Sequence, residues 1–271
     1  MPIPDYFSQP VFVLTFDLEW APEAAVAFLL NRVAAAGIVP HVFVTHASAV
    51  LARAAAEGRA ELGIHPNFLP NSTHGTGIDP VIDSVLAVAP EARSWRSHSF
   101  VDSTPLSLRM VERGILYDSN LCLFLQPNLF PLEHHSGLLR FPVFWEDDSH
   151  WRREPDWEFS RFEARFFDPG LKVINIHPLN FALNVPSQQF YDRIRGIQPG
   201  EQEDMCAYAY PGKGTATFVA DLVAAVDRRG HRFTTLETLY RHHREPASLA
   251  PNHSGLISLP PAAKTGGPGP A

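Results

Sequence analysis

The hydrophobic positions of this chain fall into short buried runs separated by longer amphipathic stretches. Residues 11–16 (VFVLTF) are apolar on both faces, which is typical of a buried parallel strand. The alanine-rich residues 23–36 follow, with Pro22 near their start and Gly37 after their end, so they predict a helix. The same alternation continues through residues 39–45, 47–57, 61–64, 81–88, 94–96, 106–113, 115–117, 138–144 and 172–176. Repeated strand and helix units predict an α/β fold with a parallel sheet or barrel inside and helices outside.

Two segments interrupt this alternation, and the composition changes at the end of the chain. Residues 117–135 and 149–169 are rich in aromatic and turn-forming residues, so we expect long loops that wall a pocket. Further helices are expected at 215–229, with Thr215 at the cap, and at 235–242. Residues 245–271 are rich in Pro, Gly, Ser and Ala. We therefore expect one domain over residues 1–244 and a flexible tail over residues 245–271.

Composition and charge narrow the class of partner. The 271 residues are 45% hydrophobic and 19% charged, as in an ordinary globular protein. A net charge of -7 gives no long-range attraction to nucleic acid or to an anionic membrane, and small molecules or oligosaccharides fit better. No apolar run is long enough to span a membrane and no leader is recognisable, so we expect a cytoplasmic protein. The two cysteines, Cys122 and Cys206, are expected to be free thiols.

Asp17 and Glu19 flank Leu18 at the end of the first apolar strand. Two acids in such a place cannot both stay buried and ionised unless a cation or hydrogen-bond donors offset their desolvation. A divalent metal ion satisfies both carboxylates. An N-cap or a solvated pair of loop acids is the structural alternative.

His65 ends another predicted strand, and His74 closes the loop HPNFLPNSTH that begins there. The prolines exclude a helical pair of histidines, but a folded loop can return His74 beside His65. Two neutral imidazoles and one carboxylate make a three-ligand site with room for water, typical of Zn²⁺, with Co²⁺, Ni²⁺, Mn²⁺ and Fe²⁺ as alternatives. Surface hydrogen bonding is the competing role for these histidines.

Two further polar residues stand at strand ends on the same side. His177 follows the buried pattern KVINI and precedes Pro178, and a histidine held there can donate a proton near neutral pH. Arg96 ends SWR and can pair with Asp17, which would keep that carboxylate ionised. The carboxyl ends of the strands are where barrels and open α/β sheets place their chemistry.

Taken in order, five short motifs resemble those of the polysaccharide deacetylases, the NodB-homology family of carbohydrate esterases. They are TFDLE at 15–19, His65 with His74, SWR at 94–96, FPVFW at 141–145 and INIHP at 174–178. The resemblance spans residues 11 to about 240 and is strongest to the divergent bacterial branch linked to surface-polysaccharide biosynthesis. It implies an irregular (β/α) barrel of about seven parallel strands and metal-dependent hydrolysis of an N-acyl sugar amide.

The resemblance also implies a role for each candidate residue. Asp17 corresponds to the catalytic base and His177 to the general acid, while Arg96 orients the base. The metal ligands implied are Glu19, His65 and His74.

This chain departs from the family pattern at two positions. Glu19 stands where the family usually has Asp, and His74 follows His65 by nine residues rather than four or five. The longer spacing leaves His98 of the RSHS segment as an alternative third ligand. A deformylase or another hydrolase of non-peptide amides on the same fold, and a catalytically silent sugar-binding relative, are the alternative functions. The sequence does not indicate an oligomeric state.

Overall fold

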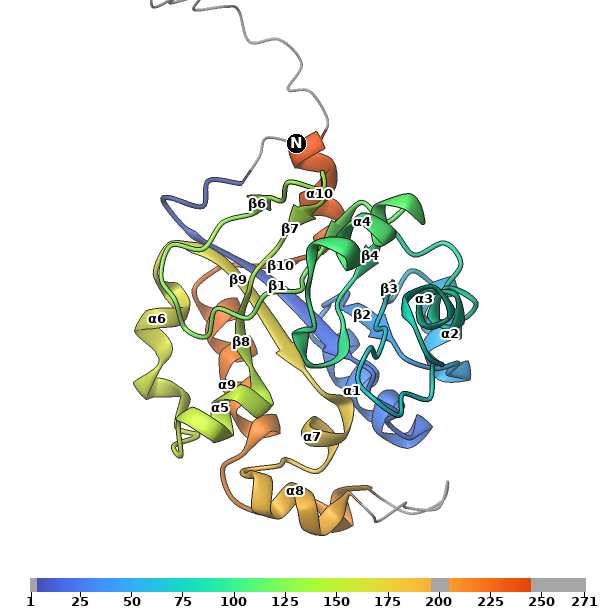
Figure 1. Ribbon diagram of the computed structural model, residues 1–271. Coiled ribbons are helices and arrows are strands. Elements are labelled where there is room, and N and C mark those ends of the chain that lie inside the picture. Colours follow the sequence, from blue (N-terminus) through green and yellow to red (C-terminus); the bar gives the residue numbers. More distant parts are fainter. Residues whose placement is uncertain (1–3, 196–204, 245–271) are drawn as a thin grey trace, which may run out of the picture.

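The computed structural model describes residues 4–195 and 205–244 and is drawn in Figure 1. Its strands form one sheet whose order is β6-β7-β5-β4-β3-β2-β1-β9-β8, with β10 paired to β1. All the pairings are parallel except that of β6 with β7. The strands are β1 (Pro10–Asp17), β2 (His41–Val44), β3 (Glu61–Ile64), β4 (Ser94–Trp95), β5 (Tyr117–Asp118), β6 (Leu132–Glu133), β7 (Leu139–Arg140), β8 (Val143–Glu146), β9 (Gly170–Ile176) and β10 (Phe233–Thr234).

The segment after β5 closes the sheet onto its far edge. The Leu123 amide donates to the Val143 carbonyl at 2.9 Å, and the Val143 amide donates to the Leu121 carbonyl at 2.8 Å. Cys122 and Val143 form a parallel bridge at this point. If β7 and β8 are taken as two halves of one strand, seven parallel strands surround the interior. The predicted irregular (β/α) barrel of about seven parallel strands is therefore confirmed.

Helices cover the outside of these strands, as Figure 1 shows. Residues after Pro22 begin the first of them at Glu23, as the sequence predicts. The α-helices are α1 (Glu23–Ala35), α2 (Ala49–Ala56), α3 (Ile78–Leu86), α4 (Thr104–Glu112), α5 (Asp147–Arg153), α6 (Glu163–Phe167), α7 (Pro178–Ala182), α8 (Gln188–Ile194), α9 (Thr215–Arg228) and α10 (Leu236–Arg244). Short 3-10 helices lie at η1 (His98–Phe100), η2 (Phe159–Arg161) and η3 (Met205–Tyr208).

An aromatic cluster fixes α9 and α6 against the sheet. The rings of Trp145 on β8 and Phe218 on α9 are stacked at 5.0 Å, and Phe166 of α6 lies 5.8 Å from Phe218. All three side chains are fully buried. Burying a large aromatic side chain contributes about 1.5–3 kcal/mol, so this cluster holds the outer helices in place.

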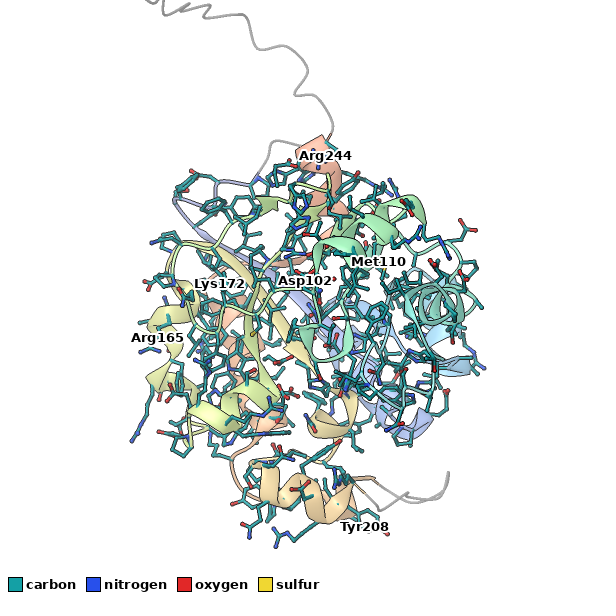
Figure 2. All side chains as sticks on the ribbon, viewed as in Figure 1. Asp102, Met110, Arg165, Lys172, Tyr208 and Arg244 are labelled. Carbon is teal, nitrogen blue, oxygen red and sulfur yellow. The ribbon has the colours of Figure 1, made fainter. Side chains whose placement is uncertain are left out.

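Side chains fill the barrel and the layer between strands and helices (Figure 2). Lys172, on β9, is an unusual member of this core because its side chain is fully buried. Its ammonium lies 4.1 Å from the centre of the Phe144 ring. Burial lowers the pKa of Lys172 to about 8.

Three local expectations differ from the structure. Residues 149–169 are not a plain loop, since they include most of α5, all of η2 and all of α6. The run 138–144 is split into β7 and β8 around Pro142, which has no amide hydrogen for the ladder. The cap of α9 is Gly214, while the Thr215 hydroxyl donates to the Val185 carbonyl at 2.9 Å.

The expected tail over residues 245–271 lies outside the described residues. Within the described ranges, no helix combines the length and the apolar character needed to cross a membrane.

Candidate active site

A cavity of about 380 Å³ opens where the carboxyl ends of β1, β8 and β9 meet. Its walls carry chemistry from several elements, including Asp17, Glu19, His98, Glu146, Asp148 and His177. A larger groove of about 860 Å³ lies between α1 and α9, but it contains none of the predicted site residues. The smaller cavity is therefore the candidate active site.

Asp17 ends β1 and is buried between two donors. The Arg96 guanidinium donates to Asp17 Oδ1 at 2.9 Å, and the Asn175 amide donates to Asp17 Oδ2 at 2.7 Å. Burial alone would raise the pKa of Asp17, but the charges of Arg96, His65 and His177 together outweigh it and the pKa is lowered. The predicted pair of Arg96 and Asp17 is present, and Asp17 is an ionised, hydrogen-bonded carboxylate.

Arg96 is fully buried, and several groups bind its guanidinium. Its Nε donates to the Ser119 carbonyl at 2.8 Å and its Nη2 to the Ser119 hydroxyl at 2.7 Å. The guanidinium carbon also lies 4.4 Å from the centre of the Phe43 ring. A buried charge without such partners would be costly, so these contacts keep the guanidinium in place beside the carboxylate.

Glu19 lies at the centre of three imidazoles. Its Oε1 is 2.6 Å from His98 Nδ1 and 3.5 Å from His65 Nε2, and its Oε2 is 3.5 Å from His177 Nε2. The backbone at Glu19 has a φ of 39°, in the left-handed region that residues other than glycine rarely adopt. Burial would raise the pKa of Glu19, but the charge of His177 and the close approach of the three imidazole rings hold it well below its usual value. The strained turn after β1 thus directs an ionised carboxylate toward the histidines.

His65 passes a direct test for a metal ligand. The side chain is 1% exposed, yet neither ring nitrogen has a hydrogen-bond partner within the described residues. Its Nδ1 lies 3.7 Å from Asp17 Oδ1. Buried polar groups are almost always satisfied, so two free nitrogens beside two carboxylates fit a bound cation.

The structure separates the two candidates for the third ligand. His74 lies outside the group around Glu19, and both of its ring nitrogens are bonded to backbone groups of Asn67 and Thr45. Burial lowers the pKa of His74. Glu19, His65 and His98 instead form a group whose ligand atoms all lie within 4.8 Å of one another. The geometry does not support the expected role of His74.

His177 stands at the end of β9 and is oriented by Asp147. Its Nδ1 lies 2.6 Å from Asp147 Oδ1, and its backbone amide donates to Asp147 Oδ2 at 3.0 Å. Burial disfavours the charged ring, but the carboxylates of Asp147 and Glu19 raise the pKa of His177 well above its usual value. The ring therefore keeps both protons to higher pH than an ordinary histidine, with Nε2 on the side of Glu19.

Glu146 is a third buried carboxyl in the cavity wall. It accepts from Asn175 Nδ2 at 3.1 Å and from the Ser149 hydroxyl at 2.6 Å. Burial and the neighbouring Asp148 raise the pKa of Glu146 well above its usual value. Asp17, Glu146 and His177 form a second group that is close enough to hold an ion.

Sequence reasoning missed Asn175, Glu146 and Asp147. Asn175 lies within the buried strand pattern KVINI, where its polar side chain is the signal that the sequence offers. Glu146 and Asp147 directly follow the motif FPVFW. Asp17 and Glu19 are site candidates because acids at the end of a buried strand indicate a functional site. The same rule applied to WEDD would have found them.

Comparisons with known proteins bear on the family and the fold. A family model described as WbmS-like polysaccharide deacetylase matches residues 14–195. No curated protein matches the sequence. A crystal structure from Bordetella bronchiseptica, described as a polysaccharide deacetylase involved in O-antigen biosynthesis, is 30% identical. Its alignment covers 79% of this chain and 89% of that chain, with a TM-score of 0.71.

A second crystal structure shares the fold at lower identity. It comes from Mycobacterium smegmatis, is described as a polysaccharide deacetylase and is 17% identical. The alignment covers 89% of this chain and 92% of that chain, with a TM-score of 0.54. The barrel and its covering helices are thus shared across distant sequences.

Proposed function

The chain belongs to the WbmS-like polysaccharide deacetylase family, and from this premise we propose that it is a metal-dependent amide hydrolase acting on an N-acyl amino sugar. The acyl group we favour is acetyl, and the sugar is part of a polysaccharide or its precursor. The involvement in O-antigen biosynthesis described for the Bordetella bronchiseptica relative supports a surface-polysaccharide precursor. A cytoplasmic location stays a prediction.

One observation carries the proposal. The buried imidazole of His65 has no hydrogen-bond partner among the described residues and stands between Asp17 and Glu19. An ionised base next to imidazole nitrogens without hydrogen-bond partners is the arrangement needed for hydrolysis assisted by a cation. When bound, a divalent ion would acidify a water and polarise the acyl carbonyl, and Zn²⁺ suits these nitrogen and carboxylate ligands.

Asp17 takes the proton from the attacking water. Its pKa lies below the ordinary carboxyl value, so it is ready to accept a proton at neutral pH. The donors Arg96 and Asn175 fix the direction of the carboxylate. Proton transfer to a general base held in the correct orientation typically raises the reaction rate by roughly 10²–10⁴-fold.

His177 supplies the proton that the leaving nitrogen needs. Asp147 holds Nδ1, so the proton on Nε2 is the one available on the cavity side. An amine cannot leave as its anion, and protonation by the imidazolium solves this problem. The products are a carboxylate and a free amino sugar. Asp17 then releases its proton to bulk water and His177 takes one up from it, which restores both groups.

The substrate class is tested by assaying the Zn²⁺-loaded protein with N-acetyl and N-formyl amino sugars, free and nucleotide-linked. We expect release of acetate. Release of formate alone would establish the deformylase alternative. Sugar binding without release of either acid would establish the silent sugar-binding alternative.

Replacing the base gives the sharpest test of mechanism. Asp17→Asn keeps the size of the side chain but removes the proton acceptor, so turnover should fall by roughly 10²-fold or more. The content of bound Zn²⁺ should stay unchanged. Asp227→Asn, on the exposed face of α9, serves as the matched control and should leave turnover unchanged. Equal turnover of Asp17→Asn and the parent protein would refute the assignment of the base.

A further inference from the structure

His74 is fully occupied as a structural residue. Its Nε2 lies 2.8 Å from the Thr45 carbonyl, which can only accept, so Nε2 carries the ring proton. Its Nδ1 accepts the Asn67 amide at 3.1 Å. Binding a cation through either nitrogen would leave a backbone group without its partner.

His98, unlike His74, lies beside both Glu19 and His65. Its Nδ1 and His65 Nε2 both approach the same oxygen of Glu19, at 2.6 and 3.5 Å. Its side chain is 22% exposed and borders the cavity, so the ring can be reached from solvent. Among the described residues, groups able to hold an ion include His98 but not His74.

The turn that carries His98 is strained and held in place. Ser99 and Phe100 have φ values of 58° and 52°, which cost free energy for residues other than glycine. Asn120 fixes both sides of this turn, since its Oδ1 accepts the Ser97 amide at 3.0 Å and its Nδ2 donates to the Val101 carbonyl at 3.1 Å. The direction of the imidazole is thus set by the surrounding structure.

The His98 turn is also tied to the strand end that carries His65. The His98 amide donates to the Pro66 carbonyl at 2.9 Å, one residue beyond His65. Trp20 lies between the two candidate histidines, with its ring 5.5 Å from that of His98 and 5.7 Å from that of His74. Trp20 therefore packs against both rings, and His74 contributes to the packing around His98.

We propose that His98 is the third protein ligand of the metal site, together with Glu19 and His65, and that His74 is structural. The inference rests on the proposed function because it concerns the same cation. It assigns the third position to the turn after β4 instead of the loop after β3.

The test is the affinity for Zn²⁺ of purified full-length protein, measured by competition with a chelating dye and without substrate. His98→Ala should weaken Zn²⁺ binding by roughly 100-fold or more, since even outer partners of ligands cost 10–100-fold. His74→Ala should stay within about threefold of the parent. His74→Asn, which can replace one donor and one acceptor, guards against loss of fold. Co²⁺ absorption in the visible range should change for His98→Ala alone.

Each result decides between the two histidines. Weak binding by both His74 variants with intact binding by His98→Ala would overturn the inference, and so would three variants that bind like the parent. Zn²⁺ binding through His98 in a protein that hydrolyses no amide would reject the proposed function and keep the inference. A parent protein that binds no Zn²⁺ would reject both.

Discussion

Asn175 links the buried base to the buried guanidinium. Its Nδ2 donates to Asp17 at 2.7 Å, and its Oδ1 accepts Arg96 Nη1 at 2.6 Å. The Thr15 hydroxyl donates to the same Oδ1 at 3.0 Å. Only an amide offers a donor and an acceptor at these two positions, so neither a carboxylate nor an aliphatic side chain can replace it.

Asn175→Leu should lower kcat/KM by roughly tenfold or more, because a hydrogen bond to a charged group contributes about 1.5–3 kcal/mol. Loss of the donor also raises the pKa of Asp17. A general base works only when deprotonated, so the acid limb of the pH profile should move to higher pH. Steady-state kinetics from pH 4 to 8, roughly the range where carboxyl groups and histidine titrate, measure both effects. An acid limb at its original pH would contradict this role.

Asp147 sets the protonation of His177. Asp147→Asn removes the negative charge that contributes most to raising the pKa of His177, so this pKa should fall. A general acid works only when protonated, and its activity is lost as pH rises through its pKa. The alkaline limb of kcat/KM should therefore move to lower pH. A variant whose alkaline limb coincides with that of the parent would show that Asp147 has no such role.

At the scale of elements, the junction of α7 and α9 depends on Asn184 and Gly214. Asn184 has a φ of 49°, and its Oδ1 accepts the amides of Ala216 and Thr217 at the start of α9. A Cβ on Gly214 would lie 2.2 Å from the Asn184 carbonyl oxygen. The two backbones approach each other so closely that only glycine fits.

Gly214→Ala should destabilise the protein by about 2–3 kcal/mol, because the clash forces apart the helix cap and its partner. Urea unfolding followed by circular dichroism measures the change. Ala220→Ser, on the exposed side of the same helix, should change stability by no more than about 0.5 kcal/mol. Equal stability of Gly214→Ala and the parent would show that the junction is not tightly packed.

At the scale of the whole molecule, the proposed ligands connect parts of the barrel that are distant in sequence. Glu19 follows β1, His65 follows β3 and His98 follows β4. An ion bound to all three stabilises the native barrel and not the unfolded chain. At 100 times Kd the gain is about 2.7 kcal/mol.

Removing Zn²⁺ with a chelator should therefore lower Tm by about 5–10 °C, given about 2–4 °C per kcal/mol for a chain of this size. Differential scanning calorimetry in the presence of Zn²⁺ and of EDTA measures the difference. Glu19→Gln should show a much smaller difference. A Tm that does not respond to Zn²⁺ would argue against an ion held between these strands.

The sequence by itself predicted the barrel and most residues of the candidate site. Buried strands such as β1 and β9 are recognisable because apolar runs of that length report local burial, and polar residues at their ends stand out against them. Asp17, Glu19, His65, Arg96 and the candidate acid His177 were found in this way. Their convergence followed from the rule that parallel strands bring their carboxyl ends together.

Only the tertiary structure decided which histidine faces Glu19 and what orients the base and the acid. From the sequence, His74 and His98 are equally plausible as the third ligand. Loop conformation decides between them, and it depends on contacts with residues such as Asn67, Thr45 and Asn120. Asn175 likewise reads as an ordinary strand residue until its register places it beside Asp17. Periodicity reports the burial of a residue, whereas hydrogen-bond partners are set by the packing of distant segments.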